Sequence, residues 1–167
     1  MLSVAKVGVA ALARVFAPFS PTCTPVEDGE AIPGSFWGAP EAGLVGDTLY
    51  LRGDTPVHSA LHEGAHFICM DAARRRALHT DAGGGDDEEV AVCYLQTLLA
   101  QRVDGYDRAQ LFADMDAWGY SFRLGSAERW YFEDAADALE WLKERGLATE
   151  SGAVSYTHLT LPTIRLV

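Results

Sequence analysis

Residues 55–69 read TPVHSALHEGAHFIC and hold the most informative pattern in the sequence. A threonine followed by a proline is a typical helix start, with the threonine as N-cap and the proline at the first helical position. The apolar spacing that follows predicts a helix over about residues 56–78. His62 and His66 lie four residues apart in it, so both imidazoles project from one face of the helix.

The histidine pair is spaced for metal binding. Tetrahedral zinc requires imidazoles that converge, and this spacing supplies two of them without distorting the backbone. Glu63 directly follows His62 and can reach a metal-bound water rather than the metal itself. There it can take a proton from the water, because zinc lowers the pKa of a water molecule that it binds. The segment therefore predicts a zinc site with His62 and His66 as ligands and Glu63 as the base.

A β-hairpin is expected directly before this helix. Its strands lie at about residues 44–45 and 48–51, and a Gly-Asp pair forms the two-residue turn. Residues 18–43 hold five of the seven prolines and are expected to form a long loop without strands. Residues 2–17 are expected to form an amphipathic helix that ends at the first of those prolines.

Three further helices are expected after the motif. A glycine run at residues 83–85 separates the first helix from a second over about residues 86–103, which carries an apolar core stripe. Two more cover about residues 108–118 and 126–145, the last with Ser126 as its N-cap. The fold class that follows is α+β and mainly helical, with the hairpin, the histidine-bearing helix and the helix over about residues 86–103 at its centre.

The composition is that of one acidic globular domain. The 167 residues are 49% hydrophobic and carry a net charge of −11, which disfavours nucleic acid and anionic membranes as partners. No apolar run reaches the ~18 residues that a membrane span needs. Cys23, Cys69 and Cys93 are too few, and odd in number, for a disulfide framework. This cysteine usage indicates a reducing, cytoplasmic location.

Residues 154–167 read VSYTHLTLPTIRLV and break the acidic, helical pattern before them. They resemble the translation of a transposase-type sequencing-library adapter, and we expect them to be a non-native tail. The alternative is a natural β-rich tail. On the adapter interpretation His158 is no ligand candidate, and one domain spans residues 1–153. That domain consists of the proline-rich loop and its preceding helix, a motif core over 44–103 and a helical addition over 104–153.

The motif core resembles the zincin metallopeptidases. Zincins place a strand just before the helix that carries HExxH, and they prefer uncharged residues around the two histidines, as found here. Gly64 departs from the pattern in character. A glycine inside a helix costs about 1 kcal/mol relative to alanine, which predicts the close approach of another backbone at this position. The resemblance covers residues 44–103.

Resemblance to the gluzincin branch implies a third zinc ligand, a glutamate on the next helix in the form Glu-x-x-Ala. Residues 88–91 read EEVA and match it with Glu88 in the ligand position. Glu89 and Asp87 remain alternatives. The competing interpretation is structural, because Asp86 and Glu89 also form a capping-box-like start and acidic residues favour any helix N-terminus.

Three further residues are candidates with weaker support. His58 lies one turn before His62 on the same face and is either a site residue or a solvated histidine. His79 follows the first helix and is either a ligand or a cation that the helix dipole favours. Tyr120 could donate a hydrogen bond to a developing oxyanion, or it is a core aromatic.

The resemblance implies a zinc-dependent hydrolase, a metallopeptidase that acts on a peptide or protein substrate. Zn²⁺ is expected on His62, His66 and Glu88, with a water molecule activated by Glu63. Residues 48–51 are expected to offer a strand edge to which substrate adds. Two alternatives stay open: a zinc-binding regulatory or structural protein without turnover, and a metal-free acidic helical module that binds other proteins.

Overall fold

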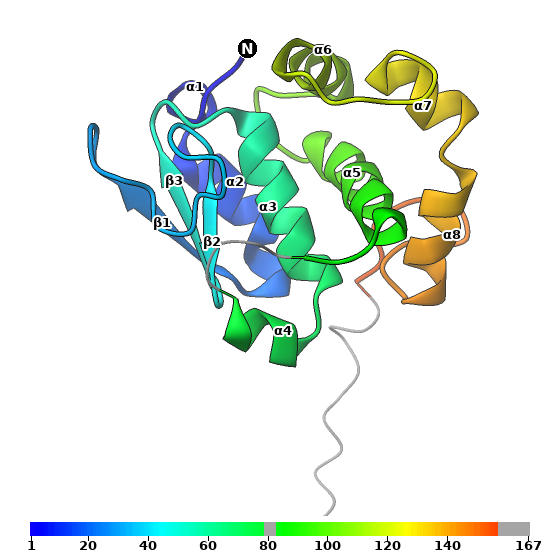
Figure 1. Ribbon diagram of the computed structural model, residues 1–167, viewed down its shortest axis with the longest axis horizontal. Helices are drawn as coiled ribbons and strands as arrows, with labels where there is room; N and C mark the ends of the chain where they lie inside the picture. The colour runs from blue at the N-terminus through cyan, green and yellow to red at the C-terminus, as the bar shows by residue number, and fades with distance from the viewer. Residues whose placement is uncertain (79–82, 157–167) are drawn as a thin grey trace, which may run out of the picture.

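The computed structural model describes residues 1–78 and 83–156, and in that part of the chain it combines a three-stranded sheet with eight α-helices. Helix α3 (Val57–Cys69) lies between the strands and helix α5 (Asp86–Ala100), as Figure 1 shows. Helix α8 (Ala136–Glu144) packs on α5 on the side away from α3 (Figure 1). The predicted α+β, mainly helical fold class is confirmed.

The sheet contains the predicted hairpin and one strand that was not predicted. Strands β2 (Gly43–Val45) and β3 (Thr48–Arg52) pair in antiparallel fashion around the expected turn. Strand β1 (Thr22–Val26) pairs with β3 in parallel, so the expectation that residues 18–43 contain no strand is wrong. Pro25 is tolerated because β1 is an edge strand, where an N–H that faces away from the partner is not needed.

The strand order also corrects the expected place of substrate addition. The sheet runs β1-β3-β2, so β3 has a hydrogen-bonded neighbour on each side. Residues 48–51 therefore offer no free edge to an incoming strand. The hydrophobic alternation of this segment indicated a strand correctly, but an alternating pattern does not tell an edge strand from a central one.

The N-terminal helix is divided at Gly8. Helix α1 covers Val4–Val7 and helix α2 covers Val9–Phe16, followed by a 3-10 turn over Ala17–Phe19. Gly8 has a φ of +87°, a left-handed value that favours glycine and interrupts the helix. The single helix expected over residues 2–17 is wrong at this point.

The start of α3 differs from the predicted cap. Pro56 occupies the N-cap with an extended backbone, and no side chain caps the helix. The hydroxyl of Thr55 instead accepts a hydrogen bond from the backbone N–H of Arg52 at 3.0 Å. The predicted threonine N-cap is therefore wrong, since this hydroxyl closes the turn between β3 and α3.

The helix predicted over residues 56–78 is two helices. Met70 is extended, with φ −79° and ψ 147°, and ends α3. Asp71 then caps helix α4 (Ala72–Ala77), its carboxylate accepting from the backbone N–H of Arg74 at 2.8 Å. This break brings Arg74 to the first turn of α5, where it meets an acidic side chain described below.

The later helices follow the prediction in part. Helix α6 (Arg108–Trp118) has the predicted bounds. The helix predicted over residues 126–145 is two helices, α7 (Ala127–Glu133) and α8, because the backbone leaves the helical region at Asp134. Ser126 caps α7 as predicted, accepting from the N–H of Arg129 at 3.2 Å.

Gly64 lies where α3 faces α2. An alanine Cβ at this position would lie 2.1 Å from Cζ of Phe16, a fully buried ring on α2. The predicted close approach is real, but it is made by an aromatic ring and not by a backbone. Glycine is needed here because it leaves room for that ring between α2 and α3.

Among the described residues, no helix is both long enough and apolar enough to cross a membrane.

The first residues of the predicted tail lie against the fold. Val154 forms an isolated β-bridge with Ala148, and the N–H of Ser155 donates to the carbonyl oxygen of Leu147 at 3.0 Å. The ring of Tyr156 lies 5.5 Å from that of Phe19, centroid to centroid. His158 and the rest of the tail lie outside the described residues. A non-native origin of residues 154–167 stays a prediction.

Candidate metal centre

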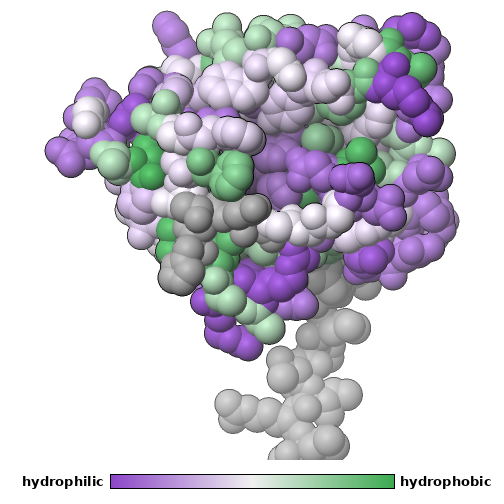
Figure 2. Space-filling model, viewed as in Figure 1, coloured by the Kyte–Doolittle hydropathy of each residue, from purple (hydrophilic) through white to green (hydrophobic). Residues whose placement is uncertain are grey.

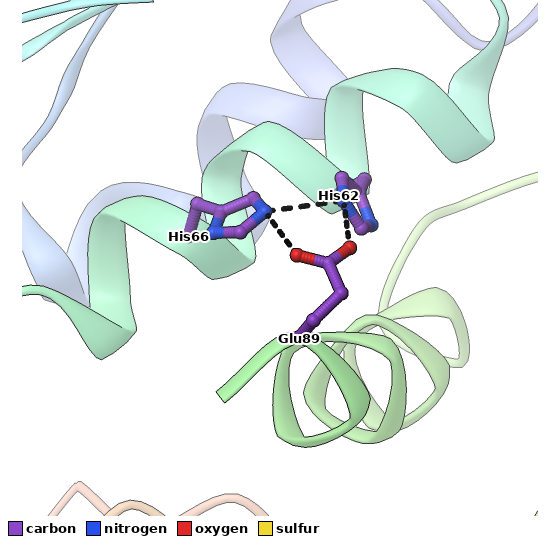
Figure 3. Close-up of side chains that lie close together, drawn as sticks. All are labelled: His62, His66 and Glu89. Atoms are coloured by element: carbon purple, nitrogen blue, oxygen red, sulfur yellow. Dashed lines mark hydrogen bonds and ion pairs between the residues drawn. The ribbon is translucent and has the colours of Figure 1, made fainter. Parts of the chain in front are cut away.

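Helices α3 and α5 bring three metal-binding side chains together, as Figure 3 shows. Nε2 of His62 lies 3.0 Å from one carboxylate oxygen of Glu89, and Nε2 of His66 lies 3.2 Å from the other. The two Nε2 atoms are 3.2 Å apart. All three side chains point into the space between the two helices (Figure 3). The predicted histidine pair therefore meets a glutamate, which is consistent with an HExxH-type site.

The spacing of the three side chains is compatible with a tetrahedral ion. Zinc binds histidine nitrogen and carboxylate oxygen at about 2.0–2.1 Å, which separates neighbouring ligand atoms of a tetrahedron by about 3.3 Å. The two Nε2 atoms are 3.2 Å apart, and each lies 3.0 or 3.2 Å from a different oxygen of Glu89. One ligand atom from each of the three residues lies within 4.8 Å of the other two. Two imidazoles and one carboxylate are also the donor set of catalytic zinc sites with an open fourth position. The residues present thus fit zinc.

Gln96 determines which nitrogen of His62 carries a hydrogen. The amide nitrogen of Gln96 donates to the backbone carbonyl oxygen of His58 at 2.7 Å. The amide oxygen therefore faces Nδ1 of His62, at 3.2 Å. This oxygen can only accept, so Nδ1 is protonated and the lone pair of neutral His62 is on Nε2. Nε2 of His62 lies beside Glu89 and His66, so His62 can bind a metal ion through this atom together with them.

The cluster requires positive charge at its centre. When His62 is neutral, its Nε2 carries a lone pair and can only accept a hydrogen bond. The nearest oxygen of Glu89, 3.0 Å away, is also an acceptor, so the two atoms repel each other. Burial alone lowers the pKa of His62, but its polar neighbours, among them the carboxylate of Glu89, raise it well above its ordinary value. A second proton or a metal ion relieves the repulsion, so metal binding should release a proton.

The carboxylate beside the histidines is that of Glu89, which corrects the prediction of Glu88. Glu88 is buried on the neighbouring face of α5, where Nη1 of Arg74 donates to its two oxygens at 2.9 and 3.0 Å. Asp87 is exposed and lines a separate pocket beside α8. The Glu-x-x-Ala spacing identified the correct turn of the helix but the wrong face, because adjacent helical residues point about 100° apart.

A second signal in the sequence does indicate Glu89. Cys93 and Gln96 follow it at spacings of four and three, so the three residues share one face of α5. Both interact with His62, which shows that this face meets α3. Gln96 is a polar residue with no exposed surface in an otherwise apolar stretch, and such a residue normally has a specific partner. This signal was missed.

His58 and Tyr120 belong to the wall of the site and not to the ligand cluster. His58 is buried, and its Nδ1 lies 3.2 Å from the hydroxyl oxygen of Tyr120. Burial lowers the pKa of His58 to about 4 and raises that of Tyr120 to about 12. Near pH 7 the imidazole is therefore neutral and the phenol keeps its proton. His79 lies outside the described residues.

An open pocket of about 480 Å³ contains the cluster. Glu63 lines it together with His62, His66 and Glu89, so the predicted base faces the same space as the predicted ligands. Figure 2 shows hydrophilic side chains gathered in the middle of this face, over the region where α3 and α5 lie side by side in Figure 1. The rest of the lining is Phe36, Trp37, Glu41, His58, Ser59, Gly83, Trp118, Gly119 and Tyr120.

Glu41 is a pocket residue that the sequence did not reveal. It lies half-buried in the wall, and its pKa is raised by burial and by the carboxylate of Glu63. The nearby backbone of Trp37, the charge of His62 and the nearby side chain of Trp118 lower the pKa of Glu41 in part. Glu41 stands in a loop without periodicity, so only the fold shows that it faces the site.

No protein-family model matches the chain, and no curated protein or solved structure matches it either. The site is therefore defined by its own side chains, an HExxH-type cluster of two histidines and a glutamate that could bind a metal ion. The chemistry of this cluster and of the pocket around it decides which function the chain can support.

Proposed function

We propose that the protein is a zinc-dependent hydrolase, and more narrowly a metallopeptidase that acts on peptide or protein substrates. The observation that carries the proposal is the meeting of His62, His66 and Glu89 at ligand distances in a pocket that Glu63 also lines. Three protein ligands leave one position of a tetrahedral zinc open, which is typical of catalytic rather than structural sites. The three cysteines are free, in keeping with a reducing, cytoplasmic location.

Three residues in and beside the pocket, Glu63, Tyr120 and Gln96, have roles in this proposal besides the ligands. Zinc, when bound, supplies a water molecule of lowered pKa and polarises the scissile carbonyl group. The carboxylate of Glu63 accepts a proton in the pocket and returns it to the leaving amine. Tyr120 keeps its proton, since its pKa is about 12, and donates a hydrogen bond to the carbonyl oxygen as negative charge develops there. Gln96 orients His62.

Zinc content is the first test, because the two glutamates give a matched pair. Zinc per chain is measured on the full chain, on His66→Ala and on the variants Glu89→Gln and Glu88→Gln. We expect about one zinc in the parent, as a tetrahedral site of this kind binds one ion. Zinc should be lost in His66→Ala and Glu89→Gln and retained in Glu88→Gln. Circular dichroism confirms that each variant is folded.

Turnover is the second test. Zinc-loaded protein is incubated with a library of internally quenched fluorescent peptides. Glu63→Gln should keep zinc and lose about 10²–10⁴-fold in kcat, the usual contribution of a general base. Zinc without cleavage in the parent would indicate a regulatory or structural zinc protein. A folded parent that binds no zinc would leave the metal-free interaction module as the better interpretation.

A further inference from the structure

A carboxylate and two indoles line the pocket beside the ligand cluster. They belong to Glu41, Trp37 and Trp118. Trp37 is 78% exposed and Trp118 is 39% exposed, although tryptophan is highly buried on average. The side chain of Trp118 and the backbone of Trp37 lie close enough to the carboxyl group of Glu41 to lower its pKa. The acid and the two aromatic residues thus form one contiguous group that solvent can reach.

The loop that carries Glu41 is firmly attached to the fold. The N–H of Ala42 donates to Oγ of Ser59 on α3 at 2.9 Å, in a buried hydrogen bond. Gly43 has no room for a side chain, because its Cβ would lie 1.8 Å from the carbonyl oxygen of Pro33. These contacts place Glu41 beside the first turn of α3, one turn before His62. Its position in the pocket is therefore built into the fold.

The charge of the pocket is negative. Its described lining residues include Glu41, Glu63 and Glu89, and none of them is a lysine or an arginine. A zinc ion at the histidines would offset the negative charges of Glu63 and Glu89. The negative charge of Glu41 would then remain without a compensating positive charge among the described lining residues. A carboxylate beside exposed indoles suits an ammonium or guanidinium group. The acid gives a charge-assisted hydrogen bond, and an indole face adds a cation–π attraction.

We propose that Glu41, with Trp37 and Trp118, forms a subsite for a cationic group of the substrate. In a peptide the group is the side chain of an arginine or lysine close to the bond that is cut. The reaction at that bond rests on the proposed function, whereas binding of the cation needs only the subsite. Glu41 is thereby a specificity residue, distinct from the three proposed zinc ligands and from Glu63.

Binding is tested on the full chain with N-acetyl-arginine amide and its neutral counterpart, N-acetyl-citrulline amide. The indole N–H signals in NMR spectra report where each probe binds. The arginine probe should bind at least about tenfold more tightly, as expected for a hydrogen bond between charged groups. It should shift the signals of Trp37 and Trp118. Trp130 and Trp141, which do not line the pocket, should be unaffected.

Two variants separate the subsite from general charge. Glu41→Gln should abolish the preference for arginine over citrulline. Glu30→Gln removes an exposed acid from the same loop, outside the pocket, and should keep the preference. Equal binding of the two probes by the parent, or a preference that survives Glu41→Gln, overturns the inference.

Zinc content of the same samples distinguishes this inference from the proposed function. A zinc-loaded parent that cleaves peptides but binds both probes equally refutes the cationic subsite and leaves the hydrolase standing. A zinc-free parent that prefers the arginine probe, with the preference lost in Glu41→Gln, supports the subsite and refutes the hydrolase. The cleavage rates of peptides that differ only in arginine or citrulline then show whether the subsite acts during turnover.

Discussion

The amide oxygen of Gln96 lies 3.2 Å from Nδ1 of His62, and a third residue sets the direction of this hydrogen bond. The amide nitrogen of Gln96 is occupied by the carbonyl oxygen of His58 at 2.7 Å, so only the oxygen remains for the imidazole. Nδ1 must therefore be the donor. Helix α5 in this way turns Nε2 of His62 toward Glu89 and His66, and Nε2 is the atom that would lose its proton when a metal ion binds.

Replacing Gln96 should weaken metal binding more than it weakens the fold. Gln96→Leu removes the acceptor for His62, and zinc affinity should fall by about 10–100-fold, as for other residues that orient metal-binding histidines. Competition with a chromophoric chelator measures the affinity. The matched control is Thr97→Val, which removes another buried hydrogen bond of α5, from Oγ1 of Thr97 to the carbonyl oxygen of Cys93. An equal loss of affinity in both variants would show that Gln96 acts through stability alone.

Glu88 should matter for stability and not for zinc. Glu88→Gln leaves Arg74 without its carboxylate partner, but the guanidinium side chain is 36% exposed and can turn to water. We therefore expect a loss of only about 1–2 kcal/mol in the free energy of unfolding. Urea denaturation of zinc-free protein measures it, and a double-mutant cycle with Arg74→Met should give a coupling of about 1 kcal/mol. Loss of zinc in Glu88→Gln at unchanged stability would make Glu88 the ligand.

The contrast between the two glutamates shows where sequence reasoning succeeds and where it fails. The hairpin, the histidine-bearing helix and the bounds of α6 depend on neighbouring residues, and local patterns predicted them. Which of Glu88 and Glu89 faces α3 depends on the rotation of α5 about its axis. That rotation is set by packing against α3 on one side and α8 on the other, and a local motif does not contain it.

The pocket wall was less predictable than the ligand pair. Glu41 and Trp118 come from segments on opposite sides of the motif in sequence, and they meet only because the loop before β2 and the end of α6 both reach the first turns of α3. Strand β1 was missed for a related reason. Its partner β3 lies beyond a long proline-rich connection, and a parallel pairing over that distance leaves no local signature.

Gly64→Ala should destabilise the protein in spite of the better helix propensity of alanine. The added methyl would lie 2.1 Å from Cζ of Phe16, a fully buried residue, so the ring or one of the two helices must shift. Overpacking of a core costs about 1–3 kcal/mol, whereas the change from glycine to alanine gains about 1 kcal/mol of helix propensity. Urea denaturation should therefore show a net loss.

A second substitution tests the cause of that loss. Phe16→Leu shortens the ring that meets residue 64 and alone should cost about 1–2 kcal/mol through the cavity that it leaves. In the double variant the alanine methyl partly fills this cavity, so the combined loss should be smaller than the sum of the two single losses. Strict additivity would contradict the direct contact between the two positions.

His58 should make the fold sensitive to mild acid. Its pKa is about 4 in the folded protein because it is buried, against about 6.5 in an unfolded chain. Between these values the unfolded state binds a proton that the folded state does not. His58 therefore leaves stability unchanged above about pH 6.5 and lowers it as the pH falls toward 4, by up to about 3 kcal/mol.

The prediction is tested by urea denaturation at pH 7.5, 6 and 5 in the presence of a chelator, so that zinc binding does not contribute. His58→Gln keeps a hydrogen-bonding group beside Tyr120 but cannot take up a proton. The carboxylates titrate in the parent and the variant alike, so the difference between the two proteins isolates the imidazole. The free energy of unfolding of the parent minus that of the variant should be smaller at pH 5 than at pH 7.5. Only the parent has a histidine at position 58 that takes up a proton on unfolding. A difference that stays constant across this range would mean that His58 is protonated equally in the folded and unfolded states. Burial would then not keep this histidine neutral.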